Sequence, residues 1–345
     1  MTTAAGETLR YTPEVEEATA GAYRRVRHVI PEIEWPVHAP DVAAIEEWKA
    51  RRYAIVLAHN SQTQEILGGV ADLTGDSLAL ARQASETEAE VIVLCGVHFM
   101  AETAKLLNPA KTVLLPDLEA GCSLAASITA ADVRRLRELH PGAPVVTYVN
   151  TSAEVKAESD ICCTSANVLD IVESLPDDEV LLLPDEYLAR WVQSRTTKKI
   201  LLWQGRCEVH EKFRAEEVRE ARDTHPGLVV IAHPECPPDV IAEADFVGST
   251  SKMSAYIDQQ RPRRVFMVTE CSMSDNVAAS HPEVEFVRPC NLCPHMKRIT
   301  LPKILRSLQT MSHRIEIAPD VARRARRAVE RMVEFAPASA PAAAN

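Results

Sequence analysis

The chain lacks long apolar runs and an excess of positive charge. No run approaches the ~18 apolar residues of a membrane-spanning helix, and the first thirty residues carry charges throughout, without the apolar core of a secretory signal. The net charge of −11 argues against nucleic acid or an anionic membrane surface as a partner. A locally positive site can still bind small anions. We therefore expect a cytoplasmic protein that binds neither nucleic acid nor membrane.

A zinc-type arrangement of cysteine pairs is also missing. Of nine cysteines, Cys290 and Cys293 form one C-x-x-C, which alone fits a zinc half-site or a redox pair, but no second pair has the usual zinc spacing. In a cytosolic chain, nine cysteines indicate metal-binding, catalytic or buried thiols rather than disulfides. Three lie in strand-like runs and are interpreted as core: Cys95, Cys162 and Cys163. Two lie at strand ends and are interpreted as neighbours of a site: Cys236 and Cys271.

The length of 345 residues, of which 46% are hydrophobic, is sufficient for two or three domains with a sizeable core. We interpret residues 1–40 as an N-terminal extension with one short helix near Glu14 to Val26. Residues 336–345 are rich in alanine and proline, which predicts a disordered tail.

Four landmarks occur in the same order three times, with a spacing of about 85 residues. The first landmark is an apolar run with a polar end: IVLAHN from Ile55, VVTYVN from Val145 and VVIAHP from Val229. The second ends in a hydroxyl residue before a helical pattern: Ser77, Ser165 and Thr250. Two further apolar runs then precede a cysteine in each unit. An ordered series of this kind indicates an internal triplication.

The apolar runs are short and continuous, and helical patterns separate them, as is typical of strands buried on both faces of a parallel sheet. The predicted fold class is therefore α/β, with three pseudo-symmetric α/β/α sandwich domains with parallel sheets around a pseudo-threefold axis. The predicted units are residues 41–125, 126–210 and 211–295. A C-terminal helical segment covers 296–335.

One cysteine closes each unit: Cys122, Cys207 and Cys293. In a pseudo-threefold molecule these thiols meet at the centre, where three ligands could hold a metal cluster and leave one iron open for chemistry. The alternative is that they are ordinary buried thiols, since free cysteine is among the most buried residue types.

Polar side chains end the first strand of each unit. His59 and His233 occupy equivalent positions, and Glu235 follows two residues later, which suggests an acid/base set. A single histidine there is often only a hydrogen-bonded structural residue. Tyr148 and Asn150 end the first strand of the second unit, where a tyrosine could also belong to the core. Ligands of parallel sheets bind beyond the carboxyl ends of the strands, so all should face one crevice.

Ser77, Ser165 and Thr250 each stand at a predicted helix start. A helix N-terminus offers unpaired N–H groups, and a hydroxyl adds a donor, so three such ends would bind carboxylates or phosphate. The alternative is that all three are plain N-caps.

Several motifs together resemble quinolinate synthase, from about residue 40 to 330 and in the right order. They are AHN (58–60), GDSLALA (75–81), GVHFMAETAKLLNP (96–109), AGCSL from residue 120, YVNTSAEVKA (148–157), CCTSAN (162–167), WQGRCEVH (203–210), HPEC (233–236), GSTS (248–251) and CPHMKRIT (293–300). The resemblance implies a cytosolic enzyme that condenses iminoaspartate with dihydroxyacetone phosphate to quinolinate, the pyridine precursor of NAD. It also implies L-aspartate oxidase or aspartate dehydrogenase as the source of iminoaspartate.

The resemblance also implies roles for single residues. It makes Cys122, Cys207 and Cys293 the ligands of a [4Fe-4S] cluster, with Cys290 a lesser candidate. It makes Glu235 the base, and it implies substrate contacts from the other candidates: His59, Ser77, Tyr148, Asn150, Ser165, His233 and Thr250. Three further histidines near the motifs are interpreted as supporting or surface residues: His98, His210 and His295.

Ser61 departs from the family pattern, which usually has a tyrosine there. Two alternative functions therefore stay open. One is a paralogous [4Fe-4S] lyase or dehydratase that acts on another dicarboxylate. The other is a non-catalytic iron–sulfur sensor, against which the histidines, Glu235 and the three predicted anion-binding helix starts argue.

Overall fold

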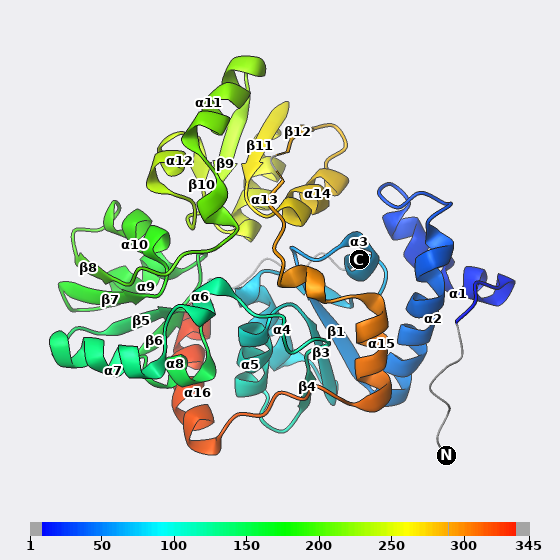
Figure 1. The fold of residues 1–345 in the computed structure, drawn as a ribbon, viewed down its shortest axis with the longest axis horizontal. Coiled ribbons are helices and arrows are strands. Elements are labelled where there is room, and N and C mark those ends of the chain that lie inside the picture. Colours follow the sequence, from blue (N-terminus) through cyan, green and yellow to red (C-terminus); the bar gives the residue numbers. More distant parts are fainter. Residues whose placement is uncertain (1–8, 289, 336–345) are drawn as a thin grey trace.

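The computed structural model describes residues 9–288 and 290–335, which form three four-stranded parallel sheets flanked by helices (Figure 1). The strand orders are β2-β1-β3-β4, β6-β5-β7-β8 and β10-β9-β11-β12. If the four strands of each unit are numbered along the chain, they therefore lie side by side in every sheet in the order second, first, third, fourth. This identity of topology confirms the predicted α/β fold with three pseudo-symmetric domains.

The elements of the three units follow one another with short connections. The first unit contains β1 (Ala54–His59), α3 (Gln64–Leu67), β2 (Leu73–Gly75), α4 (Ser77–Glu86), β3 (Val91–Cys95), α5 (His98–Leu107), β4 (Thr112–Leu114) and α6 (Ser123–Ala126). The second contains α7 (Ala130–Leu139), β5 (Val145–Tyr148), α8 (Ala153–Ala157), β6 (Ile161–Cys163), α9 (Val168–Ser174), β7 (Glu179–Leu183), α10 (Glu186–Gln193), β8 (Lys199–Leu202) and the 3-10 turn η1 (His210–Lys212). The third contains α11 (Ala215–Thr224), β9 (Val229–Ala232), α12 (Pro238–Ala242), β10 (Phe246–Val247), α13 (Thr250–Gln260), β11 (Arg264–Val268), α14 (Cys271–Ser280), β12 (Glu285–Val287) and η2 (Met296–Arg298).

In the described part of the chain, helix α2 (Trp35–Arg52) precedes β1 as α7 precedes β5 and α11 precedes β9, whereas three helices lie outside the repeats: α1 (Pro13–Val26), α15 (Leu301–Thr310) and α16 (Pro319–Glu334). The helix predicted near Glu14 to Val26 is α1. Residue 41, where the sequence places the start of the first unit, lies within α2. The predicted disordered tail, 336–345, lies outside the described residues.

The triplication extends to individual hydrogen bonds. One aspartate immediately precedes the second strand of each unit, and its carboxylate accepts the N–H of a first-strand residue at 2.7–2.8 Å. A basic residue from the helix before the first strand pairs with each aspartate. The pairs are Asp72 with Lys49, Asp160 with Arg137 and Asp245 with Arg222. The repeated Ala-Asp or Ser-Asp landmark therefore fixes the connection between these two strands.

We expect Asp72→Ala to be the most destabilising change in this repeated position. Lys49 is the most buried of the three basic partners, with its side chain only 8% exposed, and Asp72 binds its ammonium group at 2.7 Å. Because a hydrogen bond to a charged group contributes ~1.5–3 kcal/mol, the free energy of unfolding should fall by about that amount. Asp245→Ala is the matched control, since the Arg222 side chain is 32% exposed. Thermal melting should show the larger loss for Asp72→Ala, and equal losses would contradict the role of burial.

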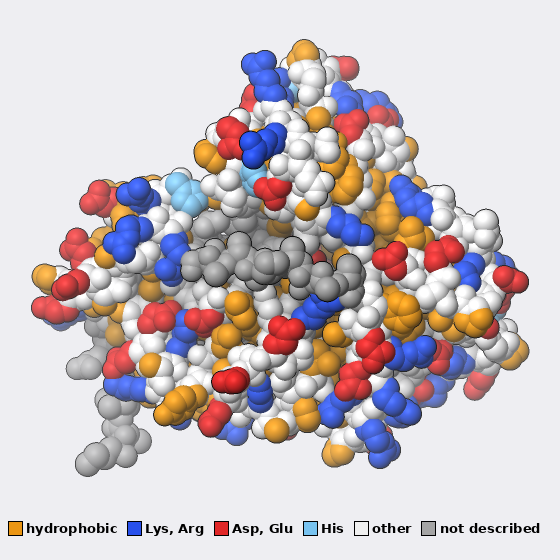
Figure 2. All heavy atoms as spheres, turned by 180° about the vertical axis from the view of Figure 1, so that it is seen from behind, with side chains coloured by type: hydrophobic (Ala, Val, Ile, Leu, Met, Phe, Trp, Pro, Cys, Tyr) orange, Lys and Arg blue, Asp and Glu red, His pale blue; other side chains and the backbone are white. Residues whose placement is uncertain are grey.

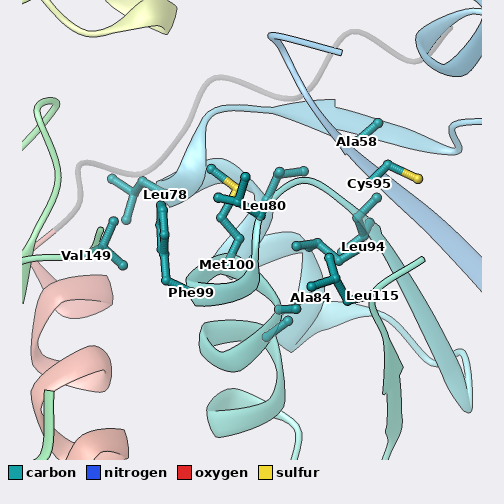
Figure 3. Packing of buried hydrophobic residues seen from close by; sticks show 14 of the residues in the cluster. Ala58, Leu78, Leu80, Ala84, Leu94, Cys95, Phe99, Met100, Leu115 and Val149 are labelled. Atoms are coloured by element: carbon teal, nitrogen blue, oxygen red, sulfur yellow. The ribbon is translucent and has the colours of Figure 1, made fainter. Parts of the chain in front are cut away.

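The first two units share a large hydrophobic core, a smaller cluster in the second unit lies apart from it, and the third unit has its own clusters. Figure 3 shows Leu78 and Phe99 of the first unit beside Val149 of the second, within one buried cluster. Helix α16 closes this core and packs against both α5 and α8 (Figure 1). Separate clusters surround the sheet of the third unit.

Cys95, Cys162 and Cys163 are fully buried in strands, which confirms their interpretation as core.

The surface is mixed in charge. Figure 2 shows acidic and basic side chains interspersed over one face of the molecule. In the described part of the chain, no helix combines the length and the apolar character needed to cross a membrane.

Polar contacts join the third unit to the others, such as Ser251 Oγ to Asp76 Oδ2 at 2.6 Å and Lys252 Nζ to the carbonyl of Ala166 at 2.8 Å.

Candidate active site

A cavity of about 120 Å³ lies where the carboxyl ends of the three sheets meet. All of the predicted site residues line it: His59, Ser77, Cys122, Tyr148, Asn150, Ser165, Cys207, His233, Glu235, Thr250 and Cys293. Phe99 and Met100, at the start of α5, add an apolar wall. The structure thus brings together residues from all three units, as the strand-end argument predicts.

His59 and His233 occupy the same local turn in two units. The Nδ1 atom of His59 accepts the N–H of Ser61 at 3.2 Å, and Nδ1 of His233 accepts the N–H of Glu235 at 3.4 Å. Because Nδ1 accepts, the neutral ring carries its proton on Nε2, and that atom of His233 lies 3.2 Å from the hydroxyl of Ser165.

Burial keeps both histidines uncharged. Removal from water lowers the pKa of His59 to about 4 and the pKa of His233 to about 3, so that both rings are neutral at pH 7. A neutral imidazole with a fixed Nδ1 is a hydrogen-bond donor through Nε2. The pair can therefore donate to substrate oxygens without adding positive charge to the cavity.

Glu235 is the centre of a buried hydrogen-bond network. Its Oε1 accepts the hydroxyl of Tyr148 at 2.5 Å, and its Oε2 lies 2.8 Å from Nδ1 of His210. Burial alone would raise the pKa of Glu235, but the neighbouring ring of His233 and the hydrogen bonds from His210 and Tyr148 lower it. Burial raises the pKa of Tyr148 well above 10, and Glu235 raises it further, so the phenol remains a donor. The carboxylate is therefore ionised and held in one orientation.

His210 belongs to this network, although the sequence alone did not assign it a place in the site. Its Nδ1 is 3.2 Å from the sulfur of Cys207, its Nε2 is 3.1 Å from the hydroxyl of Thr269, and its ring stacks on His233. The available signal was the Cys207-x-x-His210 spacing, which brings both side chains to one side of the turn that leads into η1. His295 also lines the cavity, where it contacts Glu208 at 2.7 Å.

The helix starts differ in part from the prediction. Asp76 and Ser249 are the N-caps of α4 and α13, so Ser77 and Thr250 are first-turn residues whose hydroxyls do not cap. Thr250 Oγ1 is buried and has no hydrogen-bond partner among the described residues. The expectation that Ser165 opens a helix is wrong, because α9 begins at Val168. The Asn167 side chain instead accepts the N–H of Thr164 and stabilises a turn before α9.

The three candidate ligand thiols surround the same space. Burial raises the pKa of Cys122 to about 12 and also raises the pKa of Cys207 and Cys293. The backbone N–H of Cys293 donates to Glu270, which positions its loop on α14. Because burial strongly disfavours thiolates here, a bound cation would have to supply the balancing charge.

Comparisons with known proteins give the family. The family model described as Quinolinate synthetase A protein matches residues 43–334. A quinolinate synthase of Mesorhizobium japonicum is 63% identical over 92% of this chain and 98% of its own length. Those of Agrobacterium fabrum and Caulobacter vibrioides are 61% and 49% identical over at least 92% of each chain. The chain belongs to the quinolinate synthase family. This membership confirms the motif resemblance, and the protein is an enzyme.

Quinolinate synthase membership also bears on Ser61. This residue is buried and lines the cavity, and its carbonyl accepts Lys297 Nζ at 2.8 Å. The serine therefore occupies the wall of the site, where a larger side chain would reduce the open space. Because relatives at about 60% identity bear the name quinolinate synthase, the paralogue alternative is not favoured.

Proposed function

We propose that this enzyme condenses iminoaspartate with dihydroxyacetone phosphate to quinolinate, phosphate and water in the cytoplasm. The observation that carries the proposal is the single cavity that gathers the three thiols, the two histidines and Glu235 from three units. We further propose that L-aspartate oxidase or aspartate dehydrogenase supplies the iminoaspartate.

Cys122, Cys207 and Cys293 would hold a [4Fe-4S] cluster. The donor set fits such a group. Among the described residues, the donor atoms of Cys207, His210 and Glu235 lie within 4.8 Å of one another. The three cysteine sulfurs do not form so compact a set. Single-ion bonds of ~2.3 Å need closer sulfurs, whereas a cluster joins sulfurs through several irons. When bound, the cluster supplies a Lewis-acidic iron without a cysteine ligand, suited to a reaction without net electron transfer.

The chain's own donors would bind the anionic parts of the substrates. The first turns of α4 and α13 include the backbone N–H groups of Ser77 and Thr250, which have no partner within their own helices, and the hydroxyls of these residues are not used as caps. The unpartnered Thr250 Oγ1 supports this role, since a buried hydroxyl without a partner is costly. Ser165 and the neutral His59 and His233 add donors for carboxylate or phosphate oxygens. Asn150 extends the polar wall.

Glu235 would act as the base that removes protons from substrate carbon and nitrogen during condensation and ring closure. It is ionised, and Tyr148 and His210 fix its carboxylate toward the cavity. The Tyr148 hydroxyl donates to Glu235 in the free enzyme and can turn to a substrate oxygen once Glu235 has taken a proton. His59 and His233 can exchange the Nε2 proton with substrate oxygen during tautomerisation.

An anaerobic assay for quinolinate from the two substrates tests the proposal directly. We expect formation of quinolinate and phosphate in equal amounts by iron-loaded protein. A loaded protein that makes no quinolinate would favour the paralogue or the sensor instead. Release of another product from a dicarboxylate would identify the paralogue.

Ser61→Tyr tests the departure from the family pattern. The added phenol would enter the cavity wall and contribute one hydrogen bond, worth ~1.5 kcal/mol or about tenfold in binding. We expect the product to remain quinolinate, while the KM for dihydroxyacetone phosphate or kcat changes by about tenfold. Ser61→Ala is the control and should change neither by more than about twofold, because the serine bonds seen here use its backbone. A wild-type enzyme that is inactive and a Ser61→Tyr variant that is active would show that serine abolishes the family reaction.

A further inference from the structure

Cys207, His210 and Glu235 form a compact donor set at one side of the cavity. One ligand atom from each residue lies within 4.8 Å of the others. His210 Nδ1 is the central atom, 3.2 Å from the Cys207 sulfur and 2.8 Å from Glu235 Oε2. Sulfur, imidazole nitrogen and carboxylate oxygen are the three donor types that zinc takes in proteins, with bonds of ~2.0–2.3 Å.

The residues behind these donors orient them as outer-shell partners of a metal site do. Thr269 Oγ1 is 3.1 Å from Nε2 of His210 and can accept a proton from it in the Nε2–H tautomer, in which Nδ1 no longer donates to Glu235 and can bind a metal. Tyr148 donates to Glu235 Oε1 and leaves Oε2 for the same ion. The His233 ring stacks on His210 at 4.8 Å between centroids and holds the plane of its imidazole. All three candidate ligands line the cavity, so an ion can reach them.

We propose that the cluster-free protein binds one Zn²⁺ through Cys207, His210 and Glu235, and that this ion excludes the cluster. On binding, the Cys207 thiol releases its proton to solvent and its sulfur bonds the ion. The His210 proton that Nδ1 shares with Glu235 in the metal-free protein moves to Nε2, where Thr269 accepts it, and Nδ1 bonds the ion. A water completes four-coordination toward the cavity. The binding follows from the geometry alone, whereas the exclusion rests on the proposed function, because it requires Cys207 to be a cluster ligand.

Co²⁺, added to cluster-free full-length protein without oxygen, is the probe for this site. We expect one ion per chain, with the visible bands of a tetrahedral site and a sulfur-to-cobalt charge-transfer band. Zn²⁺ should displace it and remove both signals. His210→Phe keeps the stacked ring but removes both nitrogens. It should weaken binding ~100-fold or more, since loss of even an outer-shell partner costs ~10–100-fold. Glu235→Gln keeps the size of the side chain but removes the carboxylate, so it should also weaken Co²⁺ binding.

Cys122→Ser separates this site from the cluster site. This variant should bind Co²⁺ as the wild type does while it fails to retain iron, whereas His210→Phe should retain iron while it loses Co²⁺ binding. His295→Gln, at another wall of the cavity, is the matched control and should alter neither. Weaker Co²⁺ binding in Cys122→Ser or Cys293→Ser, with unchanged binding in His210→Phe, would place the ion on the three cysteines and overturn the proposal. Absence of any Co²⁺ binding would also overturn it.

The exclusion is measured by cluster assembly. Zn²⁺-loaded wild-type protein should take up iron and sulfide at least about tenfold more slowly than metal-free protein, until a chelator removes the zinc. His210→Phe should assemble its cluster at the same rate with and without Zn²⁺. Equal rates in the wild type, despite bound zinc, would refute the exclusion and leave the zinc site itself intact. Iron retention in Cys207→Ser would refute the ligand role on which the exclusion rests.

Discussion

Cys122→Ser, Cys207→Ser and Cys293→Ser are each expected to lose most of the iron of the anaerobically purified protein and all measurable quinolinate synthesis. The wild type should be brown, with about four irons per chain if the cluster is [4Fe-4S]. The expected loss is large because each unit contributes one thiol to the shared cavity and offers no second one that lines it. Iron analysis, the visible spectrum and the quinolinate assay measure the effect.

Cys95→Ala provides the control for these three variants. Cys95 is fully buried in β3 and does not line the cavity, so its replacement should leave the iron content unchanged. Cys290→Ser tests the lesser candidate, an exposed cysteine that lies outside the cavity lining, and should also retain iron. If all three single serine variants kept their iron and colour, the assignment of Cys122, Cys207 and Cys293 as cluster ligands would be wrong. If only Cys290→Ser lost its iron, the third cluster ligand would be Cys290 rather than Cys293.

Glu235→Gln is expected to lower turnover at least about a hundredfold while cluster content stays the same. The amide keeps the size of the carboxylate and can still contact Tyr148, but it cannot accept a proton at neutral pH. A positioned base contributes ~10²–10⁴-fold to rate, so kcat should fall strongly. The KM values should change far less, because the proposed carboxylate contacts at Ser77, Ser165 and Thr250 remain.

Glu208→Gln is the matched control for this variant. Glu208 also lines the cavity, but its carboxylate pairs with His295 and is about one-third exposed. We expect only a small change in kcat. If Glu235→Gln loses only a few-fold in turnover, Glu235 positions the substrate and His59 or His233 is the base. Iron must be counted in each preparation, since a variant without its cluster reports on assembly rather than on proton transfer.

The site could be predicted largely because the triplication aligns equivalent positions. Once His59 and His233 are equivalent, each is expected at the carboxyl edge of its own sheet, and the packing of the units brings these two edges to one cavity. The same reasoning placed Cys122, Cys207 and Cys293 around one cavity. The roles assigned to these residues rest on the family resemblance and remain predictions for the experiments above.

His210 and Ser165 show where this reasoning stops. The importance of His210 depends on Thr269, Glu235 and the ring of His233, which are distant in the chain and meet only in the folded protein. A hydroxyl residue after a strand predicts a helix start, but Ser165 lies in a turn that the Asn167 side chain stabilises before α9.

The sequence by itself determined the parallel sheets, the triplication and the residues gathered at the centre, because apolar periodicity and repeated landmarks are local patterns. Only the tertiary structure decided that the first two units share a core closed by α16, while the third keeps its own. It also decided that Glu235 is ionised and that His59 and His233 are neutral. The physical reason is that burial and hydrogen-bond partners set protonation, and both depend on residues from different units.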